Sequence, residues 1–356
     1  MNKKKVLIGL SGGVDSTVAA SILKDGGYHV EGFYMKNGFP GKSETAARSA
    51  ADKLNIPLHI ADVSDPFREE IVDCFVREYL SGRTPNPCVV CNKKIKFFYL
   101  MKLAEQFGCD HIATGHYARI KDIGGENGYR IRKGADTKKD QSYFLSRLGQ
   151  KELKRIIFPH GNSTKEEVKE MAASIGFASL AKKESQEICF ISSDYRDFLE
   201  SYAQVTLPRS GNIVTLEGRI VGRHRGIHTL TIGQRKGLDI SSRRPYYVLE
   251  IRRETNEVVV GRDEDQLFGG LIATDISWVS PDHLPLKDIE ARVHIRYRHP
   301  GVDATIEKHR SDDKRESALV TFAKPQKAIA PGQAAVFYQG DMVIGGGCIE
   351  RGIKRD

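Results

Sequence analysis

The feature that most constrains the fold of this chain is the junction between a hydrophobic strand and a helix near its N-terminus. Residues 6–10 form a continuous apolar run, which is typical of a buried parallel strand. The sequence SGGVDS follows at residues 11–16, and a helix is predicted to begin at Ser16. Two adjacent glycines permit a tight turn, and the unpaired N–H groups at the helix start carry the positive end of its dipole. This junction therefore predicts a phosphate-binding site.

Asp15 extends this prediction to a cation. A carboxylate beside phosphates usually shares a positive ion with them, and Mg²⁺ is commonly bound by one or two carboxylates together with substrate phosphates. Asp15 is therefore predicted either to hold Mg²⁺ or to orient the loop. A generic Gly-Gly pair before a capped helix would need no ligand, but here all six positions fit one phosphate-binding pattern.

Strands and helices alternate over the first 120 residues. Strands are predicted at 6–10, 29–35, 57–63 and 111–114, and helices from residue 16 and at 44–54, 66–80 and 92–107. Such alternation favours an α/β fold with a doubly wound parallel sheet, which binds ligands at the carboxyl ends of its strands. Ser11 and Gly115 both fall on that edge.

The sequence changes character after about residue 205, where short alternating strands and turn signals such as Gly211-Asn212 and Pro331-Gly332 replace the helices. With 356 residues, the chain is predicted to form three units: an α/β catalytic domain at 1–200, a small β-rich domain at 205–270 and a barrel-like β domain at 271–356. The fold class is therefore a doubly wound α/β domain followed by two smaller β-rich domains.

The chain is basic, with a formal net charge of +9 and a pI near 9.1, which favours an anionic partner such as nucleic acid. Between Arg209 and Arg262 there are eleven Lys and Arg against five Asp and Glu. This excess suits a phosphate backbone, and a solvated basic face explains the count almost as well. No apolar run approaches the roughly 20 residues of a membrane span, so a cytoplasmic protein with no membrane contact is expected.

Three of the six cysteines require an explanation. Cys88 and Cys91 form a CxxC in TPNPCVVCNKK, which is predicted to be a proline-stiffened loop leading into a helix. A helix N-terminus with Lys93 and Lys94 adjacent is predicted to lower the pKa of Cys91 and make it a nucleophile. Cys189, in ESQEICF, would on its own most simply be a buried core residue.

Nine segments, in their order along nearly the whole chain, together resemble the tRNA-specific 2-thiouridylases, a family of PP-loop ATP pyrophosphatases. The segments are GLSGGVDS, FYMKN, GRTPNPCVVCNKKIKF, ATGHYARI, KKDQSYFL, ESQEICFI, HRGIHTLTIGQRKGL, IRYRH and PGQAAVFY. The resemblance implies an enzyme that binds the anticodon arm of tRNA, adenylates the 2-oxygen of the wobble uridine (position 34) with ATP, and replaces that oxygen with sulfur. The sulfur would come from a cysteine desulfurase or a sulfur-relay protein.

The resemblance also implies roles for individual residues. Cys91 matches the nucleophile and Cys189 the cysteine that carries a persulfide, with a disulfide between them at the end of the reaction. The positions that match ATP contacts are Gly9, Leu10, Ser11, Gly12, Gly13, Val14, Asp15, Ser16, Met35 and Gly115. The positions that match contacts with the target base are Asn86, Pro87 and Cys88, and those that match other tRNA contacts are His116, Lys139, Asp140, Gln141, Arg296, Tyr297 and Gln333.

One departure from the family leaves two alternatives open. Relatives commonly carry an aspartate with an acid/base role where this chain has Cys88. Either another group manages the proton, or Cys88, Cys91 and Cys189 ligate an iron–sulfur cluster with one open iron. Zinc fits less well, because a structural zinc site uses four ligands.

The sequence leaves two alternative functions beside the thiouridylase. A PP-loop ligase that forms amides or guanidines needs no paired cysteines, and a non-catalytic RNA-binding relative needs no intact SGGVDS loop.

Overall fold

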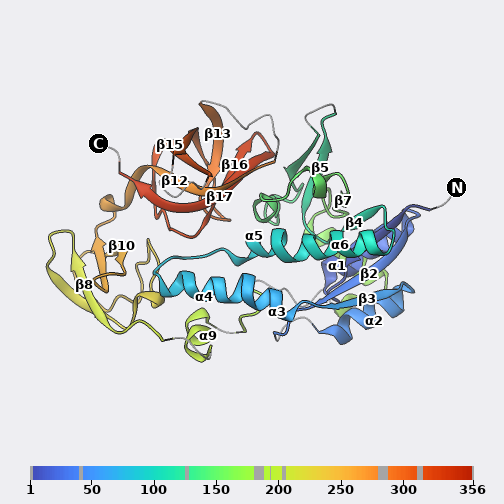
Figure 1. Ribbon diagram of the computed structural model, residues 1–356, viewed down its shortest axis with the longest axis horizontal. Helices are drawn as coiled ribbons and strands as arrows, with labels where there is room; N and C mark the ends of the chain where they lie inside the picture. The colour runs from blue at the N-terminus through green and yellow to red at the C-terminus, as the bar shows by residue number, and fades with distance from the viewer. Residues whose placement is uncertain are drawn as a thin grey trace.

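A five-stranded parallel sheet organises the N-terminal part of the molecule (Figure 1). The computed structural model describes residues 3–39, 43–124, 128–179, 188–192, 194–202, 206–279, 288–310 and 316–354. The sheet has the order β3-β2-β1-β4-β7, with β1 Lys5–Gly9, β2 His29–Lys36, β3 Leu58–Asp62, β4 His111–Ala113 and β7 Ile156–Ile157. All four pairings are parallel, as the alternation predicts. The chain adds β2 and β3 on one side of β1 and then returns to β4 on the other, so the topological switch point lies between β1 and β4.

Helices cover both faces of this sheet because successive residues of the central strand point in opposite directions. Val6 and Ile8 pack with α1 (Val14–Asp25), α2 (Glu44–Leu54) and α8 (Lys165–Ser174). Leu7 packs on the other face, against α6 (Phe97–Gln106). The predicted α/β class with a doubly wound sheet is therefore confirmed.

Two long helical rods run side by side across the middle of the molecule (Figure 1). The first consists of α3 (Ser64–Phe67), the π-helical turn Arg68–Val72 and α4 (Asp73–Leu80). The second consists of α5 (Pro87–Cys91), the π-helical turn Asn92–Lys96 and α6. The second rod begins five residues before the predicted helix start at residue 92, because the Asn86 side chain accepts a hydrogen bond from the Val89 N–H and Pro87 occupies the first helical position. The CxxC therefore lies inside a helix and not on a loop that leads into it.

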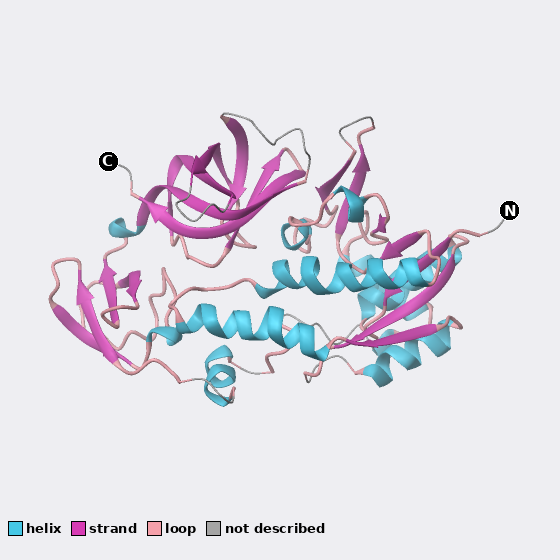
Figure 2. Cartoon of the chain, viewed as in Figure 1, coloured by secondary structure: helices cyan, strands magenta, loops and turns pink. Residues whose placement is uncertain are grey.

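Two β-rich units follow, as predicted (Figure 2). The first is a four-stranded sheet of order β10-β11-β8-β9, with β8 Gly211–Thr215, β9 Ile220–His224, β10 Tyr247–Arg252 and β11 Glu257–Gly261. The second contains β12 Leu267–Trp278, β13 Ile289–His294, β14 Val302–Arg310, β15 Glu316–Lys327, β16 Ala334–Gln339 and β17 Met342–Ile353. β12 pairs with both β15 and β17 and so closes these six strands into a barrel. It also spans residues 270 and 271, where the sequence suggests a division between units.

The barrel is attached to the N-terminal unit by a shared sheet edge. The hairpin β5 (Ala118–Asp122) and β6 (Tyr129–Lys133) belongs to the N-terminal unit by sequence, but β6 pairs with β17 of the barrel. Tyr143 and Leu145 share a hydrophobic core with Val336 and Tyr338 of the barrel. A movement of the barrel would therefore strain the N-terminal unit.

The remaining described helices are short. They are α7 (Gln150–Leu153), α9 (Tyr195–Ser201) and the 3₁₀ turns Ser142–Leu145, Ile227–Thr229 and Glu264–Gln266. In the part of the chain that the structure describes, no helix combines the length and apolar character needed to cross a lipid bilayer.

Candidate active site

The SGGVDS segment forms the loop between β1 and α1 at the carboxyl edge of the parallel sheet. Gly12 has a φ of +71°, and a Cβ there would lie 2.5 Å from the backbone carbon of Ala46 in α2, so only glycine suits this position. Gly13 has a φ of −83° and caps α1. A Cβ built at Gly13 would lie 3.5 Å from the Ser11 hydroxyl and, apart from its chain neighbours, within 4 Å of no other atom of the residues that the structure describes. The space above Gly13 and the N-terminus of α1 therefore has room for a phosphate.

Hydroxyl groups hold this loop in shape. Ser16 Oγ donates a hydrogen bond to the Gly13 carbonyl at 3.0 Å and accepts one from the Ser11 N–H at 3.1 Å. Thr17 Oγ1 donates to the same Gly13 carbonyl at 2.9 Å. Helix α1 begins at Val14, two residues before the predicted start, because Gly13 already acts as its N-cap. The unpaired N–H groups of the first helical turn therefore belong to the SGGVDS segment itself.

The other residues predicted to contact ATP gather around this loop. Gly9 ends β1 and Leu10 follows it, while Met35 lies near the carboxyl end of β2. Gly115 comes two residues after β4, on the other side of the switch point. A Cβ at Gly115 would lie 2.7 Å from the backbone carbon of Asp15, so this glycine allows the two loops to touch. The structure thus brings the predicted ATP-contacting positions to one edge of the sheet.

Asp15 is engaged by three side chains from elsewhere in the sequence. Its Oδ1 atom accepts hydrogen bonds from Lys165 Nζ at 2.6 Å and from the Tyr117 hydroxyl at 2.7 Å. Its carbonyl oxygen lies 2.7 Å from Nε2 of His160, which is completely buried. Burial and then the Asp15 charge hold the pKa of Tyr117 far above its ordinary value, so this hydroxyl remains a donor.

A magnesium ion does not fit Asp15 in this arrangement. The carboxylate already has a cationic partner in Lys165, and a metal bound to it would lie close to that ammonium group and be repelled by it. The sequence-based alternative in which Asp15 orients the loop agrees better with these contacts.

The two cysteines predicted to take part in catalysis lie on segments that share a hydrophobic core. Cys91, at the end of α5, packs at the edge of the core that contains Phe75 and the buried Phe190. Cys189 precedes Phe190 and is exposed, as is Cys88, so the interpretation of Cys189 as a core residue is wrong. Both of these thiols act electrostatically on Cys91, and all six cysteines are unbridged. Residues 184–187, the first part of the ESQEICF segment, lie outside the described residues.

The predicted lowering of the Cys91 pKa is wrong. Burial raises the pKa of this thiol to about 12, and the positive charge of Lys96 and a hydrogen bond from its backbone oppose the increase only in part. Lys93 and Lys94 do not lower the pKa of Cys91, because each forms an ion pair with a glutamate, at 2.7 and 2.5 Å. Cys91 is also the last residue of α5, away from the helix N-terminus. In this state of the protein, Cys91 is therefore a protonated thiol at neutral pH.

We expect Lys96→Met to slow alkylation of Cys91 by iodoacetamide by about 3- to 10-fold at a given pH, because loss of the cation raises the thiol pKa and leaves less thiolate. In the wild type, the rate should increase with pH from 7 to 10 without a plateau, since the pKa is about 12. Exposed Cys189 should react faster. Mass spectrometry of the labelled peptides measures each rate. Lys93→Met, which removes a lysine already paired with Glu152, is the matched control and should leave the Cys91 rate unchanged.

The iron–sulfur alternative gains no support from the cysteine arrangement. Cys88, Cys91 and Cys189 all lie in the described part of the chain, yet they do not form a set that could ligate a metal ion. We therefore derive no step through a cluster.

The segment that precedes the CxxC is held by the C-terminal barrel. Gln333 Nε2 donates hydrogen bonds to the carbonyl oxygens of Thr84 at 2.9 Å and Pro85 at 3.4 Å. The Thr84 N–H donates to the Pro331 carbonyl at 2.8 Å. Gln333 was predicted to contact tRNA, and here its amide fixes the backbone just before Asn86. The barrel therefore sets the position of the predicted base-binding residues.

The other predicted tRNA contacts differ in their surroundings. Asp140 is turned inward, where its carboxylate accepts hydrogen bonds from two backbone N–H groups and one serine hydroxyl. Gln141 accepts a hydrogen bond from the Tyr117 N–H at 3.0 Å, so it also supports the site from within. Arg296 is exposed, Lys139 is half-buried, and the Tyr297 ring packs on Phe144. Of these, Arg296 is the most accessible to an RNA backbone.

Two lysines that the sequence analysis did not single out belong to the site. Lys96 Nζ lies 3.5 Å from Nε2 of His116, another predicted tRNA contact, and also acts on Cys91. Lys165 binds Asp15 from 150 residues away. Lys96 could have been found from its place one turn beyond the CxxC. No spacing signal points to Lys165, because only the folded structure brings α8 to the phosphate loop.

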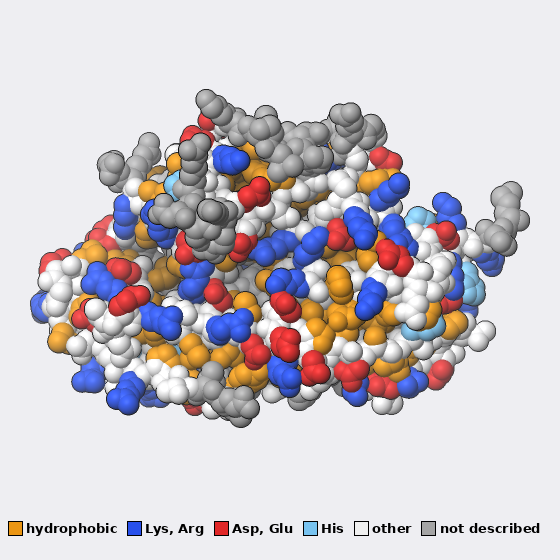
Figure 3. Space-filling model, in the orientation of Figure 1, with side chains coloured by type: hydrophobic (Ala, Val, Ile, Leu, Met, Phe, Trp, Pro, Cys, Tyr) orange, Lys and Arg blue, Asp and Glu red, His pale blue; other side chains and the backbone are white. Residues whose placement is uncertain are grey.

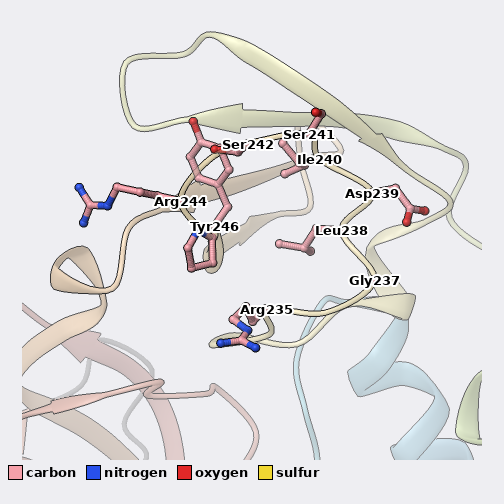
Figure 4. A pocket seen from close by; sticks show the side chains of 10 residues that line it. Arg235, Gly237, Leu238, Asp239, Ile240, Ser241, Ser242, Arg244 and Tyr246 are labelled. Atoms are coloured by element: carbon pink, nitrogen blue, oxygen red, sulfur yellow. The ribbon is translucent and has the colours of Figure 1, made fainter.

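A cavity of about 420 Å³ lies in the central β-rich unit, away from the phosphate loop. Figure 4 shows Leu238, Ile240 and Tyr246 around it, with Arg235 at one edge and Arg244 at another. Arg244 is paired with Glu264, whereas Arg235 makes no ion pair or hydrogen bond with any residue that the structure describes. The lining of this cavity therefore combines an apolar and aromatic surface with two arginines and one carboxylate, that of Asp239.

A parallel sheet with SGGVDS at its switch point, followed by two β-rich units, defines an ATP-using enzyme of the PP-loop class. Family models match along the chain: a tRNA methyl transferase HUP domain at residues 4–193, a tRNA methyl transferase PRC-barrel domain at 196–262 and an aminomethyltransferase beta-barrel domain at 268–349. The chain belongs to the tRNA-specific 2-thiouridylase family, as the following relatives show.

Three curated relatives cover almost the whole chain. The tRNA-specific 2-thiouridylase MnmA 2 of Syntrophus aciditrophicus is 49% identical over 92% of this chain and 100% of its own length. The tRNA-specific 2-thiouridylase MnmA of Carboxydothermus hydrogenoformans is 43% identical over 99% of each chain. The corresponding enzyme of Lachnoclostridium phytofermentans is 44% identical over 97% of this chain and 99% of its own.

Proposed function

We propose that this protein is a tRNA-uridine 2-sulfurtransferase that uses ATP to replace the 2-oxygen of the wobble uridine with sulfur. The observation that carries the proposal is the presence of a phosphate-binding loop and a cysteine pair in one α/β unit. Gly12, Gly13 and the start of α1 form the loop, and Cys91 and Cys189 lie on segments joined by one hydrophobic core. The full-length similarity to 2-thiouridylases supports the same activity.

The first step activates the uridine. The uracil carbonyl oxygen attacks the α-phosphate of ATP, the bond to the β-phosphate breaks, and pyrophosphate leaves. The adenylated oxygen can then depart as AMP, which a free uracil oxygen cannot do. We assign phosphate binding to the backbone N–H groups at the start of α1 and to the Ser11 hydroxyl, while the Ser16 hydroxyl donates to the Gly13 carbonyl and supports the loop.

The second step transfers sulfur. A protein donor, such as a cysteine desulfurase or a relay protein, leaves a persulfide on Cys189, which is exposed and accessible to it. Cys91 attacks Sγ of Cys189 and releases hydrosulfide, which attacks C2 of the uridine and displaces AMP. A Cys91–Cys189 disulfide remains and takes two electrons from an external thiol. Because its pKa is raised, the Cys91 thiol must lose its proton in a later state, and the charge of Lys96 favours that loss.

The target base must leave the anticodon stack to reach this site. Single-stranded loops permit such extrusion at low cost, and enzymes that modify bases commonly require it. Gln333 fixes Thr84 and Pro85, and α5 begins two residues later at Pro87, so a base bound to residues 86–88 would be presented to Cys91 on the same helix. We therefore assign base binding to Asn86, Pro87 and Cys88.

Mg²⁺ is assigned only as the ordinary counter-ion that accompanies ATP in solution.

The β-rich units are assigned to the anticodon arm of tRNA. Figure 3 shows Lys and Arg side chains spread over this face, interspersed with Asp and Glu, so the charge is distributed and not a single patch. Arg235 beside the central cavity and exposed Arg296 at the barrel are suitable phosphate contacts. Since tRNA modification of this kind occurs with free tRNA, we place the protein in the cytoplasm.

We expect Arg235→Ala to weaken tRNA binding by about 3- to 10-fold at low salt and to reduce the slope of log K against log [salt] by about one. The physical reason is the loss of one phosphate contact and its released counter-ion. Fluorescence anisotropy with labelled tRNA at several salt concentrations measures both quantities. Arg252→Ala removes an exposed arginine of β10 that is paired with Glu250, and it should change binding far less. Equal effects of the two variants would contradict this assignment.

The function itself is tested by nucleoside mass spectrometry of tRNA from a strain that lacks this protein. The proposal requires loss of 2-thiouridine derivatives and their return when the gene is restored. Unchanged 2-thiouridine would instead favour an amide- or guanidine-forming PP-loop ligase or a non-catalytic RNA-binding protein.

A further inference from the structure

Lys165 is a buried cation beside the phosphate loop, the SGGVDS segment of residues 11–16. Its side chain is 7% exposed, and it is the first residue of α8. A lysine is rarely buried to this extent unless an opposite charge compensates it. The Lys165 N–H donates to Asp136 Oδ2 at 3.0 Å, and Thr164 and Glu167 form a capping box that fixes the start of the helix. The position of this ammonium group is therefore determined by the local fold.

The compensating charge is Asp15, the acidic residue of SGGVDS. Lys165 Nζ lies 2.6 Å from Asp15 Oδ1, and the Tyr117 hydroxyl donates to the same oxygen at 2.7 Å. The ammonium group also lies 5.7 Å from the centre of the Tyr117 ring. The His160 ring stacks on the Tyr117 ring, with 5.3 Å between the two ring centres. Asp15 is thus held by donors that come from outside its own loop.

The contact between Lys165 and Asp15 reduces a charge repulsion at the loop. A carboxylate in the first turn of a helix opposes the approach of phosphates, because both are negative and share the same space. A metal ion usually removes such repulsion, but here a cation is already built into the protein. With Lys165 in place, the Asp15–Lys165 pair is neutral, and the N-terminal dipole of α1 acts on ATP without opposition.

We propose that Lys165 is a positioning residue that serves as the fixed counter-cation of Asp15, so that the phosphate loop accepts ATP without a metal ion on that carboxylate. This inference rests on the proposed use of ATP. It assigns Asp15 the task of orienting the loop through Lys165 and Tyr117. The triphosphate can still carry its own Mg²⁺ elsewhere.

Equilibrium binding of ATP to the full-length protein tests this inference through four variants. Lys165→Met leaves Asp15 uncompensated and should weaken ATP binding by at least about 30-fold, through restored repulsion at short range. Asp15→Asn should weaken it far less, because it removes the repelling charge. The double variant should bind ATP at least about tenfold more tightly than Lys165→Met alone, since neither the charge nor its partner remains. Lys165→Arg should recover much of the wild-type affinity because it restores a cation.

Titration with Mg²⁺ provides a second readout that a merely structural role would not change. If Asp15 instead ligates the metal, Asp15→Asn should be the most damaging variant, should require more Mg²⁺ for half-maximal ATP binding, and should not improve binding in the Lys165→Met background. That pattern would overturn the inference. Lys169→Met, four residues further along α8, is the matched control and should leave ATP binding unchanged.

The same variants separate this inference from the proposed function. If Lys165→Met does not fold, the comparison of Asp15→Asn with the double variant and with Lys165→Arg decides the matter, because a thermal melt shows which proteins are folded. If the wild type binds ATP with the predicted order of variants but releases no pyrophosphate with tRNA, the inference stands and the proposed function fails. If it releases pyrophosphate and Lys165→Met binds ATP normally, the inference fails alone.

Discussion

Replacement of either Cys91 or Cys189 by serine is expected to reduce 2-thiolation by more than about 1,000-fold while tRNA-dependent pyrophosphate release continues. A serine hydroxyl can neither carry a persulfide nor attack one, so both variants remove sulfur transfer. Neither cysteine belongs to the phosphate loop, so activation of the uridine should proceed. The two rates are measured together, with thiolated nucleoside by mass spectrometry and pyrophosphate by a coupled assay.

Cys74→Ser is the matched control for this experiment. Cys74 is a half-buried free cysteine in α4, a different helix from that of the CxxC, and thiolation should remain close to the wild-type rate. Full thiolation by both the Cys91 and Cys189 variants would contradict the assigned sulfur chemistry. Loss of pyrophosphate release together with thiolation would show that the cysteines act earlier than we assign them.

The second large effect concerns two neighbouring glycines with different environments. Gly12→Ala should destabilise the protein by about 2–4 kcal/mol, because alanine at a φ of +71° is strained and its Cβ would lie 2.5 Å from the Ala46 backbone. Gly13→Ala should leave stability almost unchanged, because its φ of −83° suits alanine and its surroundings are open. The added methyl group would instead occupy the space expected for a phosphate, and ATP affinity should fall by at least about tenfold.

Thermal melts and ATP titrations distinguish these two effects. The predicted pattern is a lower melting temperature for Gly12→Ala and a normal one for Gly13→Ala, with weakened ATP binding in the latter. An unchanged ATP affinity in Gly13→Ala would mean that the phosphates do not lie above this residue. A normal melting temperature for Gly12→Ala would show that α2 can move away from the loop.

The sequence predicted the parallel sheet well because its signals are local. Apolar runs of about five residues and glycine turns depend on near neighbours, and the structure confirms the parallel sheet that they predict. The convergence of the loop after β1 with Gly115 after β4 also followed, since a doubly wound sheet brings those ends together. Local patterns and a known topology were sufficient to predict that these two loops meet at one edge of the sheet.

The properties that depend on long-range packing were not predictable in the same way. The pKa of Cys91 was predicted in the wrong direction because burial against residues around Phe75 outweighs the nearby lysines. The contact of Lys165 with Asp15 and the pairing of β6 with β17 join residues more than 100 positions apart. No spacing or composition signal encodes such contacts, and they determine the electrostatics of the site and the position of the barrel.

The central claim is tested most directly by a reconstituted reaction with the purified full-length protein. The components are ATP labelled in the α-phosphate, a tRNA transcript with an unmodified wobble uridine, and a cysteine desulfurase with cysteine. The account predicts one sulfur at the 2-position of that uridine, with one AMP and one pyrophosphate formed per sulfur incorporated. Thiolation that needs no ATP, sulfur at another nucleotide, or AMP formation coupled to an amide product would contradict it.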